Sequence, residues 1–395
     1  MKILHIEDFF HPDAGYQINI LCKHMAKMGH EVVILTAQMD KVPIGLTNFF
    51  GRENTKERDA AYMSAYGVRI IRLPIKRFIS GRAVFEKSLF KTIQAESPDV
   101  VYIHGNDTLI GISYLLRYKQ MGFPLIMDSH MLAMASHNKF SNAFHWFYRH
   151  FLTPKIIKNH IWIIRTQNDP FVQQKLGIPL EQAPWISVGS DTLLFQPDYE
   201  ARKAFRQQHN IPEDAFVVVY AGKLSEDKGG MLLANAIKEK LPSAREIVFV
   251  VVGQTVGEYG REVEAIFSES ENRILRFPTQ KYTDLAKFYQ MADLAVFPRQ
   301  CSLSFYDVQA CGLPVLFEDN NINTDRCKHN NGLTFISDDA TSMRDKLLTF
   351  IEMGADEFYK MGQNGITLVK NSYDYADIAK QYMSYVEDAV TRYYQ

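Results

Sequence analysis

The stretch KILHIEDFFHPDAGYQINILCKHMAKMGHEVVILTA, residues 2–37, decides the fold. Its opening KILHI predicts a strand, and EVVILTA at its end is a β-branched run typical of a strand buried on both faces. Between them Ile20, Met25 and Met28 recur near helical spacing, and Gly29 stands where a helix ends. Strand, helix and strand in this order form a βαβ unit, which implies a parallel sheet.

The same alternation continues along the chain. VRIIRLP, DVVYIHG, PLIMDSH and IWIIRTQ predict further strands, with a helix in FEKSLFKTIQAE. Around residue 196 the charged segment FQPDYEARKAFRQQHNIPED predicts a linker and a short helix. Strands then return in AFVVVYAG, EIVFVVVG, RILRFP, LAVFP and GLTFI, with helices in MLLANAIKEKL and from about Ala340 to Gln395. We therefore expect an α/β protein of two doubly wound, Rossmann-like halves, with ligands outside the carboxyl ends of the strands and the active site in a cleft between the halves.

Length and composition limit the classes of protein to consider. The 395 residues are too many for one comfortable core, so two domains are expected. The formal net charge of −1 gives no bulk attraction to nucleic acid, which is excluded as a partner on this basis. The four cysteines lack C-x-x-C spacing, so free thiols are expected rather than disulfides or a zinc site. We find no signal peptide and no apolar run of roughly 18 residues, which predicts a cytoplasmic protein without a transmembrane helix.

The segment AGKLSEDKGG follows a predicted buried strand at the start of the second half. Gly222 follows this strand, and Lys223 and Lys228 lie five positions apart across the loop and the next helix start. Two ammonium groups at the carboxyl end of a strand suit a diphosphate, whose oxygens offer several acceptors. Solvated surface lysines are the alternative, since most lysines are exposed. In the first half Gly15 precedes a helix N-terminus and would let a ligand approach the backbone, although a simple βα turn is the better explanation of this segment alone.

Two histidines end strands of the first half. His130 ends PLIMDSH, and His104 lies at the end of DVVYIHG. Either side chain can face the cleft, where a histidine donates a hydrogen bond or moves a proton near neutral pH. A structural role is the alternative for each of them.

The stretch CSLSFYDVQACGLPVL predicts a serine-rich turn, the start of a helix and then a strand. Hydroxyl and backbone N–H groups of Ser302, Leu303 and Ser304 can hold a phosphate or a sugar hydroxyl at such a helix start, while a plain capping role for Ser302 stays open. The one carboxylate of the stretch is Asp307, and the ionised group shortly before it is Arg299.

These pieces together resemble retaining glycosyltransferases of the GT-B fold, family four. AGKLSEDKG is similar to the G-R-L-x-x-x-K-G segment of that family, and DVQACGLPVL is similar to its E-A-M-A-C-G-x-P-V. SVGSDTLLFQPD resembles the interdomain P-N-G-V-D-x-x-x-F-x-P, and KHNNGLTFISDD resembles E-x-x-N-G-x-L-x-x-x-x-D. The N-terminal glycine loop, helix and G-H-E-V strand also match. The pieces lie in the family's order over nearly the whole chain.

The resemblance assigns roles to particular residues. Lys223 and Lys228 match the basic pair on the donor diphosphate, with Lys223 in place of the usual arginine. Gly15 matches the glycine of the N-terminal loop, near the diphosphate and the acceptor. His130 matches the cleft histidine that contacts the transferred sugar, and Asp307 matches the second glutamate of E-x7-E, which holds the ribose hydroxyls.

The first glutamate of E-x7-E, which contacts donor-sugar hydroxyls in the family, has no counterpart in this chain. Arg299 stands eight residues before Asp307, and the spacing around it indicates a small deletion. The role of the missing glutamate passes, on this interpretation, to the hydroxyls of Ser302 or Ser304, or to the backbone N–H groups of Ser302, Leu303 and Ser304. The predicted substrate-binding set is therefore Gly15, Gly222, Arg299, Ser302, Leu303, Ser304 and Asp307.

The resemblance also implies an activity and a domain plan. The implied enzyme is a hexosyl- or N-acetylhexosaminyl-type transferase that needs neither cofactor nor metal, in line with the absence of a D-x-D motif. It implies a nucleotide-diphosphate sugar as the donor, with UDP-sugar favoured over GDP-sugar. It further implies an acceptor-binding domain over 1–195, a nucleotide-sugar-binding domain over 196–375, and a helix over 376–395 that crosses back to the first domain.

The expected acceptor is a glycan or a lipid-linked glycan, in surface polysaccharide or glycoconjugate synthesis. NKFSNAFHWFYRHFLTPKIIKNH, residues 138–160, is aromatic and basic, and such a segment suits the anionic inner face of a membrane. Core packing of the aromatic stripe is the stronger alternative, because aromatic stripes are usually buried. Two alternatives to the transferase also stay open: a non-catalytic GT-B accessory subunit, favoured by the missing glutamate, and a sugar-nucleotide epimerase.

Overall fold

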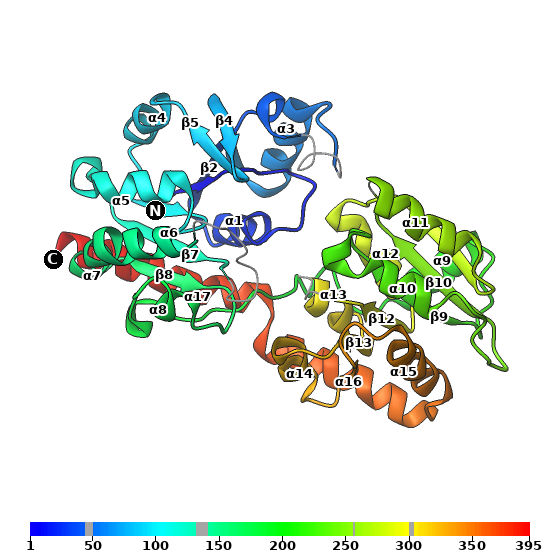
Figure 1. Ribbon diagram of the computed structural model, residues 1–395. Helices are drawn as coiled ribbons and strands as arrows, with labels where there is room; N and C mark the ends of the chain where they lie inside the picture. The colour runs from blue at the N-terminus through cyan, green and yellow to red at the C-terminus, as the bar shows by residue number, and fades with distance from the viewer. Residues whose placement is uncertain (44–49, 132–140, 256, 300–303) are drawn as a thin grey trace. The chain divides into compact units, whose positions relative to one another are not determined.

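The computed structural model describes residues 1–43, 50–131, 141–255, 257–299 and 304–395. It divides the chain into two compact units. The first combines Met1–Val188 with Tyr375–Gln395, and the second is Gly189–Asp374. The first boundary thus lies a few residues before the predicted position at 195–196. The chain leaves the first unit once and returns to it with its last helix, α17 (Figure 1).

The first unit is built on a six-stranded parallel sheet in the order β3-β2-β1-β6-β7-β8. Its central strands are buried over almost their whole length, as their β-branched composition predicts. The strands are β1 Lys2–Glu7, β2 Glu31–Ala37, β3 Val68–Leu73, β6 Val100–Ile103, β7 Leu125–Ser129 and β8 Trp162–Arg165. A separate antiparallel hairpin, β4 Ile75–Ile79 with β5 Arg82–Phe85, follows β3.

Helices cover this sheet, and α17 lies against α1, β6 and β7. The buried side of α17 is apolar apart from its tyrosines, which places the end of the chain in the core of the first unit. The helices are α1 Gln17–Lys27, α3 Thr55–Tyr66, α4 Ser88–Glu96, α5 Leu109–Met121, α6 Ser141–Phe147, α7 Thr153–Lys158, α8 Phe171–Gln174 and α17 Tyr375–Tyr394. Short helical turns are η1 Met39–Lys41, η3 Tyr148–Leu152 and η4 Leu180–Gln182.

The second unit repeats the plan with a parallel sheet in the order β11-β10-β9-β12-β13-β14. Its strands are β9 Phe216–Ala221, β10 Ile247–Val252, β11 Arg273–Phe277, β12 Leu294–Phe297, β13 Val315–Glu318 and β14 Gly332–Phe335. Its helices are α9 Tyr199–Gln208, α10 Gly230–Ala236, α11 Gly257–Ser268, α12 Leu285–Gln290, α13 Ser304–Ala310, α14 Asn321–Cys327, α15 Ala340–Glu352 and α16 Ala355–Ser372, with turns η5 Glu226–Lys228 and η6 Tyr282–Asp284. Both predicted doubly wound halves are thereby confirmed.

Some elements differ from the sequence prediction. Helix α10 ends at Ala236, well before the end of MLLANAIKEKL, because the next carbonyls are bound elsewhere: that of Ile237 accepts from Ser270 and Asn272, and that of Glu239 accepts from Asn272. The hairpin β4–β5 and the helix α3 had no counterpart in the predicted elements. Among the described helices, none combines the length and apolarity needed to span a membrane.

The strand orders indicate where ligands are expected to bind in each sheet. β1 lies between β2 and β6, and β9 lies between β10 and β12, so the winding direction reverses beside β1 and beside β9. In doubly wound sheets, ligands occupy the crevice outside the carboxyl ends of the strands at such a switch point. Functional side chains are therefore expected at the carboxyl ends of β1, β6, β9 and β12.

Candidate functional site

Beyond the carboxyl end of β9 the chain turns sharply and carries two lysines. Lys223 follows the strand directly, and Lys228 ends the turn η5. Partial burial lowers the pKa of Lys223, and the charge of Lys228 lowers it further against the opposing effect of Asp227. The two ammonium groups are thus near enough to repel each other, and an anion lying between them would relieve that repulsion.

Close backbone packing holds this turn against the neighbouring strands. A Cβ on Gly253, which follows β10, would lie 1.8 Å from the carbonyl oxygen of Gly222. A Cβ on Gly229, which has φ +73°, would lie 2.9 Å from Cβ of Pro298 and 3.0 Å from Cγ of Arg299. Only glycine fits at either position. The loops after β9, β10 and β12 therefore meet at the switch point of the second sheet.

Arg299 lies at this same edge, just beyond β12. Its Nη1 donates to the carbonyl of Glu226 at 3.0 Å, and its Nη2 pairs with the carboxylate of Asp338 after β14. The hydrogen bond to Asp338 raises the pKa of Arg299. Arg299, predicted to bind substrate, thus connects the turn that carries Lys223 and Lys228 to the end of β14. The positive charge of Arg299 is paired with the carboxylate of Asp338.

Asp307, the predicted ribose ligand, is buried in α13 with 2% of its surface exposed. Its Oδ1 is 2.7 Å from the hydroxyl of Ser190, in the SVGSD segment, and 3.3 Å from that of Tyr282. Burial raises the pKa of Asp307 to about 8 against the lowering effect of these two hydrogen bonds. The role of Asp307 on ribose stays a prediction. Ser304 begins α13, whereas Ser302 and Leu303 lie outside the described residues.

In the first unit, a buried chain of side chains leads to His130 at the end of β7. Nδ1 of His5 is 2.9 Å from Nε2 of His104, and Nδ1 of His104 is 2.8 Å from the carboxylate of Asp128. The other Asp128 oxygen is 3.3 Å from Nε2 of His130, and Nδ1 of His130 is 3.3 Å from the hydroxyl of Thr166. The predicted histidine, His130, and its competitor, His104, are therefore the two partners of one carboxylate.

The four side chains linked in this way differ in exposure and in charge. The side chain of His130 is 50% exposed, while His5, His104 and Asp128 are buried. Desolvation acts to lower the pKa of His130, but the charge and hydrogen bond of Asp128, together with the charges of Glu7 and Asp107, raise the pKa overall. Burial lowers the pKa of His5 well below its usual range, with a further lowering effect from His104. Relative to a free imidazole, the arrangement disfavours the protonated form of His5 at the buried end and favours that of His130 at the accessible end.

The three ligand atoms of His104, Asp128 and His130 lie within 4.8 Å of one another. A divalent ion held at about 2.1 Å by two of them would keep those two atoms about 3.4 Å apart in a tetrahedral site. The 2.8 Å between His104 and Asp128 is shorter and is a hydrogen-bond distance. The spacing therefore fits a hydrogen-bonded chain better than a metal site.

Two carboxylic acids at the end of β1 were not among the predicted site residues. Burial raises the pKa of Glu7 to about 8 and that of Asp8 to about 7. Nη1 of Arg82 lies 3.9 Å from Asp8, and the same guanidinium pairs with Asp107 after β6. The sequence did contain a signal for these site residues, because Glu and Asp stand side by side at the end of the first strand. The topology places this strand end at the switch point of the first sheet.

Gly15 lies in the loop between β1 and α1, as predicted. The loop is held by His11, whose carbonyl accepts from Asn19 at 2.9 Å and whose Nε2 is 3.2 Å from Nη1 of Arg58. Arg58 also pairs with Asp13 at 3.1 Å. The glycine therefore occupies a braced loop at the same sheet edge as Glu7.

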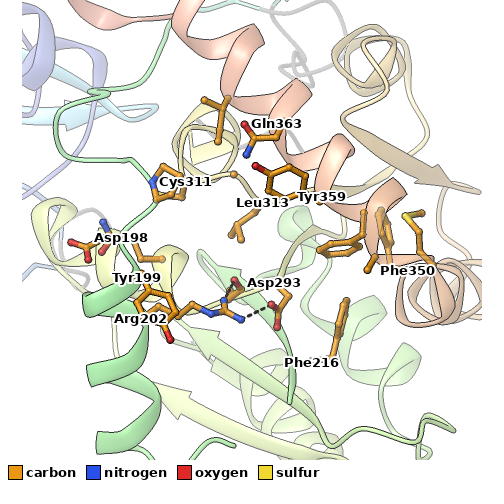
Figure 2. Close-up of a pocket in the computed structure, with 18 of the residues that line it drawn as sticks. Asp198, Tyr199, Arg202, Phe216, Asp293, Cys311, Leu313, Phe350, Tyr359 and Gln363 are labelled. Carbon is orange, nitrogen blue, oxygen red and sulfur yellow. Dashed lines mark hydrogen bonds and ion pairs between the residues drawn. The ribbon is translucent and has the colours of Figure 1, made fainter. Parts of the chain in front are cut away.

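A pocket of about 760 Å³ lies at the opposite, amino-terminal edge of the second sheet (Figure 2). Its wall includes Phe216 at the start of β9, Leu313 before β13, and an ion pair in which Arg202 donates to Asp293 at 2.7 Å. Asp293 also accepts from Arg206 and from the backbone of Val217. These charges are paired with each other within the protein. We therefore infer a structural role, in which the ion pairs attach α9 to the sheet.

Two models of known protein families match this chain. Residues 14–155 match the family described as Glycosyl transferase 4-like domain, and residues 201–388 match Glycosyl transferases group 1. The chain belongs to the GT-B glycosyltransferases of family four. The resemblance inferred from the sequence motifs is thereby confirmed, and the two matches fall on the two sheets that carry the candidate site residues.

Individual relatives of this glycosyltransferase share shorter segments. A lipopolysaccharide 1,2-N-acetylglucosaminetransferase of Salmonella typhimurium is 34% identical over 122 residues, which is 28% of this chain and 32% of that protein. A D-inositol 3-phosphate glycosyltransferase of Xylanimonas cellulosilytica is 31% identical over 151 residues, 35% of this chain and 36% of that protein. The matched segments span about a third of the length of these relatives.

Among solved structures, Alr3699/HepE of Anabaena in complex with UDP and glucose superimposes on this glycosyltransferase with a TM-score of 0.74. The match covers 98% of this chain and 100% of that one at 18% identity. At this level of identity the likeness shows the shared fold and nothing finer.

Proposed function

We propose that the chain is a retaining glycosyltransferase that moves a hexosyl or N-acetylhexosaminyl group from a UDP-sugar to a glycan or lipid-linked acceptor. The observation that carries the proposal is the pair Lys223 and Lys228 at the carboxyl end of β9, in a chain of this family. Two movable ammonium groups at a switch point suit a diphosphate. UDP is favoured because the Anabaena protein of the same fold was solved with UDP and glucose.

In the proposed reaction, the bond between the anomeric carbon and the β-phosphate oxygen breaks, and negative charge develops on the departing diphosphate. Lys223 and Lys228 stabilise this charge electrostatically, so no metal is required. The acceptor hydroxyl attacks from the face that the nucleotide leaves, and the departing phosphate oxygen takes its proton. His130, held by Asp128, donates a hydrogen bond to the transferred sugar.

The proposed setting is the cytoplasmic face of a membrane, in the synthesis of a surface polysaccharide or glycoconjugate. The relative from Salmonella typhimurium that is named as a lipopolysaccharide glycosyltransferase supports this setting. A lipid-linked acceptor would be presented at that surface, so the protein would need only a peripheral contact with the membrane.

A sugar-nucleotide epimerase is the second candidate. It is favoured by Glu7 and Asp8, whose pKa values of about 8 and about 7 suit proton transfer near neutral pH. Arg82, which lies near Asp8 and pairs with Asp107, would orient such groups.

Incubation of the purified protein with a panel of UDP- and GDP-sugars tests both proposals. Release of free sugar and nucleoside diphosphate, with the α-anomer formed first from an α-linked donor, is the result expected of a retaining transferase acting slowly on water. Conversion to an isomeric nucleotide-sugar would establish the epimerase instead. Binding of a nucleotide-sugar with neither product would overturn both and leave an accessory subunit.

A further inference from the structure

The aromatic, basic segment after β7 has one buried side and one exposed side. Tyr148 and Leu152 are buried in the core of the first unit, and Phe144 and Phe147 pack against that core. The sequence prediction of core packing therefore holds for one side of the stripe only. On the other side, the exposed fractions are 59% for Trp146, 49% for Phe151 and 41% for Ile157.

A π-helical turn between α6 and α7 gathers the exposed rings. In this turn, η3, the backbone N–H of Thr153 donates to the carbonyl of Tyr148 five residues earlier. In a regular α-helix with about 3.6 residues per turn, Trp146 and Phe151 would point in directions about 140° apart. The wider turn instead leaves their ring centroids 5.9 Å apart. A change of helix geometry therefore places two large rings side by side on the surface.

The charged side chains of this segment of the sequence have one sign. No Asp or Glu occurs between Asp128 and Asp169, while Arg149, Lys155 and Lys158 lie on or beside the exposed side. His150 is also exposed, with its ring centroid 4.8 Å from that of Trp146. An exposed apolar cluster among cations is unusual for a surface that faces only water.

We propose that Trp146, Phe151 and Ile157, with Lys155 and Lys158, form a membrane-docking surface for bilayers that contain anionic lipids. Trp and Phe side chains lodge at the level of lipid headgroups, and lysines nearby pair with lipid phosphates. The choice of a bilayer over a protein partner rests on the proposed function, because a lipid-linked acceptor is presented at a membrane. The basic charge without any acid in the segment is complementary to an anionic surface.

Flotation of the full-length protein with vesicles tests the proposal. The wild-type protein should float with phosphatidylcholine vesicles that contain phosphatidylglycerol, and less so with phosphatidylcholine alone or at high salt. Trp146→Ala with Phe151→Ala should lose about tenfold or more in vesicle affinity, and each of Lys155→Gln and Lys158→Gln about fivefold at low salt. Tyr199→Ala with Tyr359→Ala, which removes two rings of the second unit that are more exposed than Trp146 and Phe151, is the matched control and should bind like the wild type.

Two outcomes would overturn the proposal: no flotation of the wild type on anionic vesicles at low salt, or equal flotation of the Trp146→Ala, Phe151→Ala variant. Circular dichroism and thermal melting check that each variant is folded. Donor hydrolysis in solution, without vesicles, is the separate readout for the proposed activity, and the docking variants should retain it. Vesicle binding without turnover would therefore reject the transferase and keep the docking surface, and turnover without binding would do the reverse.

Discussion

At the scale of single residues, the candidate donor site depends on two positive charges carried by a turn that packs closely, through its glycines, against the neighbouring loops. Lys223 and Lys228 follow β9, and the close approaches at Gly229 and Gly253 leave the turn that carries them little room to move. The cost of holding two like charges together is lowest when an anion lies between them.

Lys228→Ala should reduce turnover of the nucleotide-sugar by about 100-fold or more, because one of the two charges that stabilise the leaving diphosphate is lost. Its melting temperature should stay near that of the wild type, since Lys228 is partly exposed. Steady-state kinetics and thermal melting measure the two effects. Lys238→Ala, at an exposed lysine paired with Glu269 in the same unit, is the control. Unchanged turnover in Lys228→Ala would remove the diphosphate assignment.

Asp128→Asn should lower the pKa of His130, because the negative charge that raises it is removed while desolvation remains. The imidazole resonances of His130, followed by NMR over a pH series, measure this directly and independently of activity. If the histidine acts in its protonated form, the pH at which activity falls should move down by the same amount. Asp99→Asn, at the amino-terminal edge of the sheet, should leave both unchanged. An identical titration in the two variants would contradict the role of Asp128.

Asp307 links folding stability to pH. Its pKa is raised from 3.8 to about 8 in the folded protein, so between about pH 4 and pH 8 the folded state holds a proton that the unfolded state has released. The contribution to stability is full below about pH 4 and is lost as the pH rises towards 8. Asp307→Asn, which keeps an oxygen for Ser190 and Tyr282, should therefore melt above the wild type at pH 8, with the gap closing towards pH 5. A melting curve series should show no such gap for the exposed Asp345→Asn, and parallel curves for Asp307→Asn would exclude this linkage.

At the scale of elements, the sequence predicts what depends on local pattern. The strands of both sheets, the turn of Lys223 and Lys228, and the position of His130 at a strand end could all be inferred from apolar runs and their ends. The ion pair of Arg299 with Asp338 could not, because it joins residues 39 positions apart. The acids Glu7 and Asp8 were visible, but their raised pKa values depend on burial that no spacing reveals. The hairpin β4–β5 was not predicted from the sequence, because its charged residues interrupt the alternation of apolar and polar residues that indicates a strand.

Helix α17 offers a test of how an element far along the chain stabilises the first unit. The buried hydroxyl of Tyr382 accepts from Nε2 of Gln17 in α1 at 2.7 Å and donates to the carbonyl of Ile186 at 3.2 Å. Tyr382→Phe leaves both partners buried without a hydrogen bond and should cost about 1 to 3 kcal/mol in the free energy of unfolding. Denaturant unfolding measures the change. Tyr394→Phe, at an exposed tyrosine of the same helix, should cost nothing measurable, and equal stability of the two variants would contradict the role of the Tyr382 hydroxyl.

At the scale of the whole molecule, two units with separate apolar cores should unfold as two cooperative transitions in calorimetry. Tyr382→Phe should lower only the transition of the first unit. UDP should raise the transition of the second unit, which carries Lys223 and Lys228, by more than that of the first. A single transition unaffected by UDP would contradict the assignment of the nucleotide to the second unit.

The return of the chain to its first unit also has a consequence for biosynthesis. Val188 and Tyr375 flank the whole second unit, and the core of the first unit is incomplete without α17. During synthesis, the first unit must wait with part of its apolar surface uncovered while the second unit emerges and folds. The part of the protein translated first is therefore the part that matures last, and chaperones would have the longest access to the face that α17 finally covers.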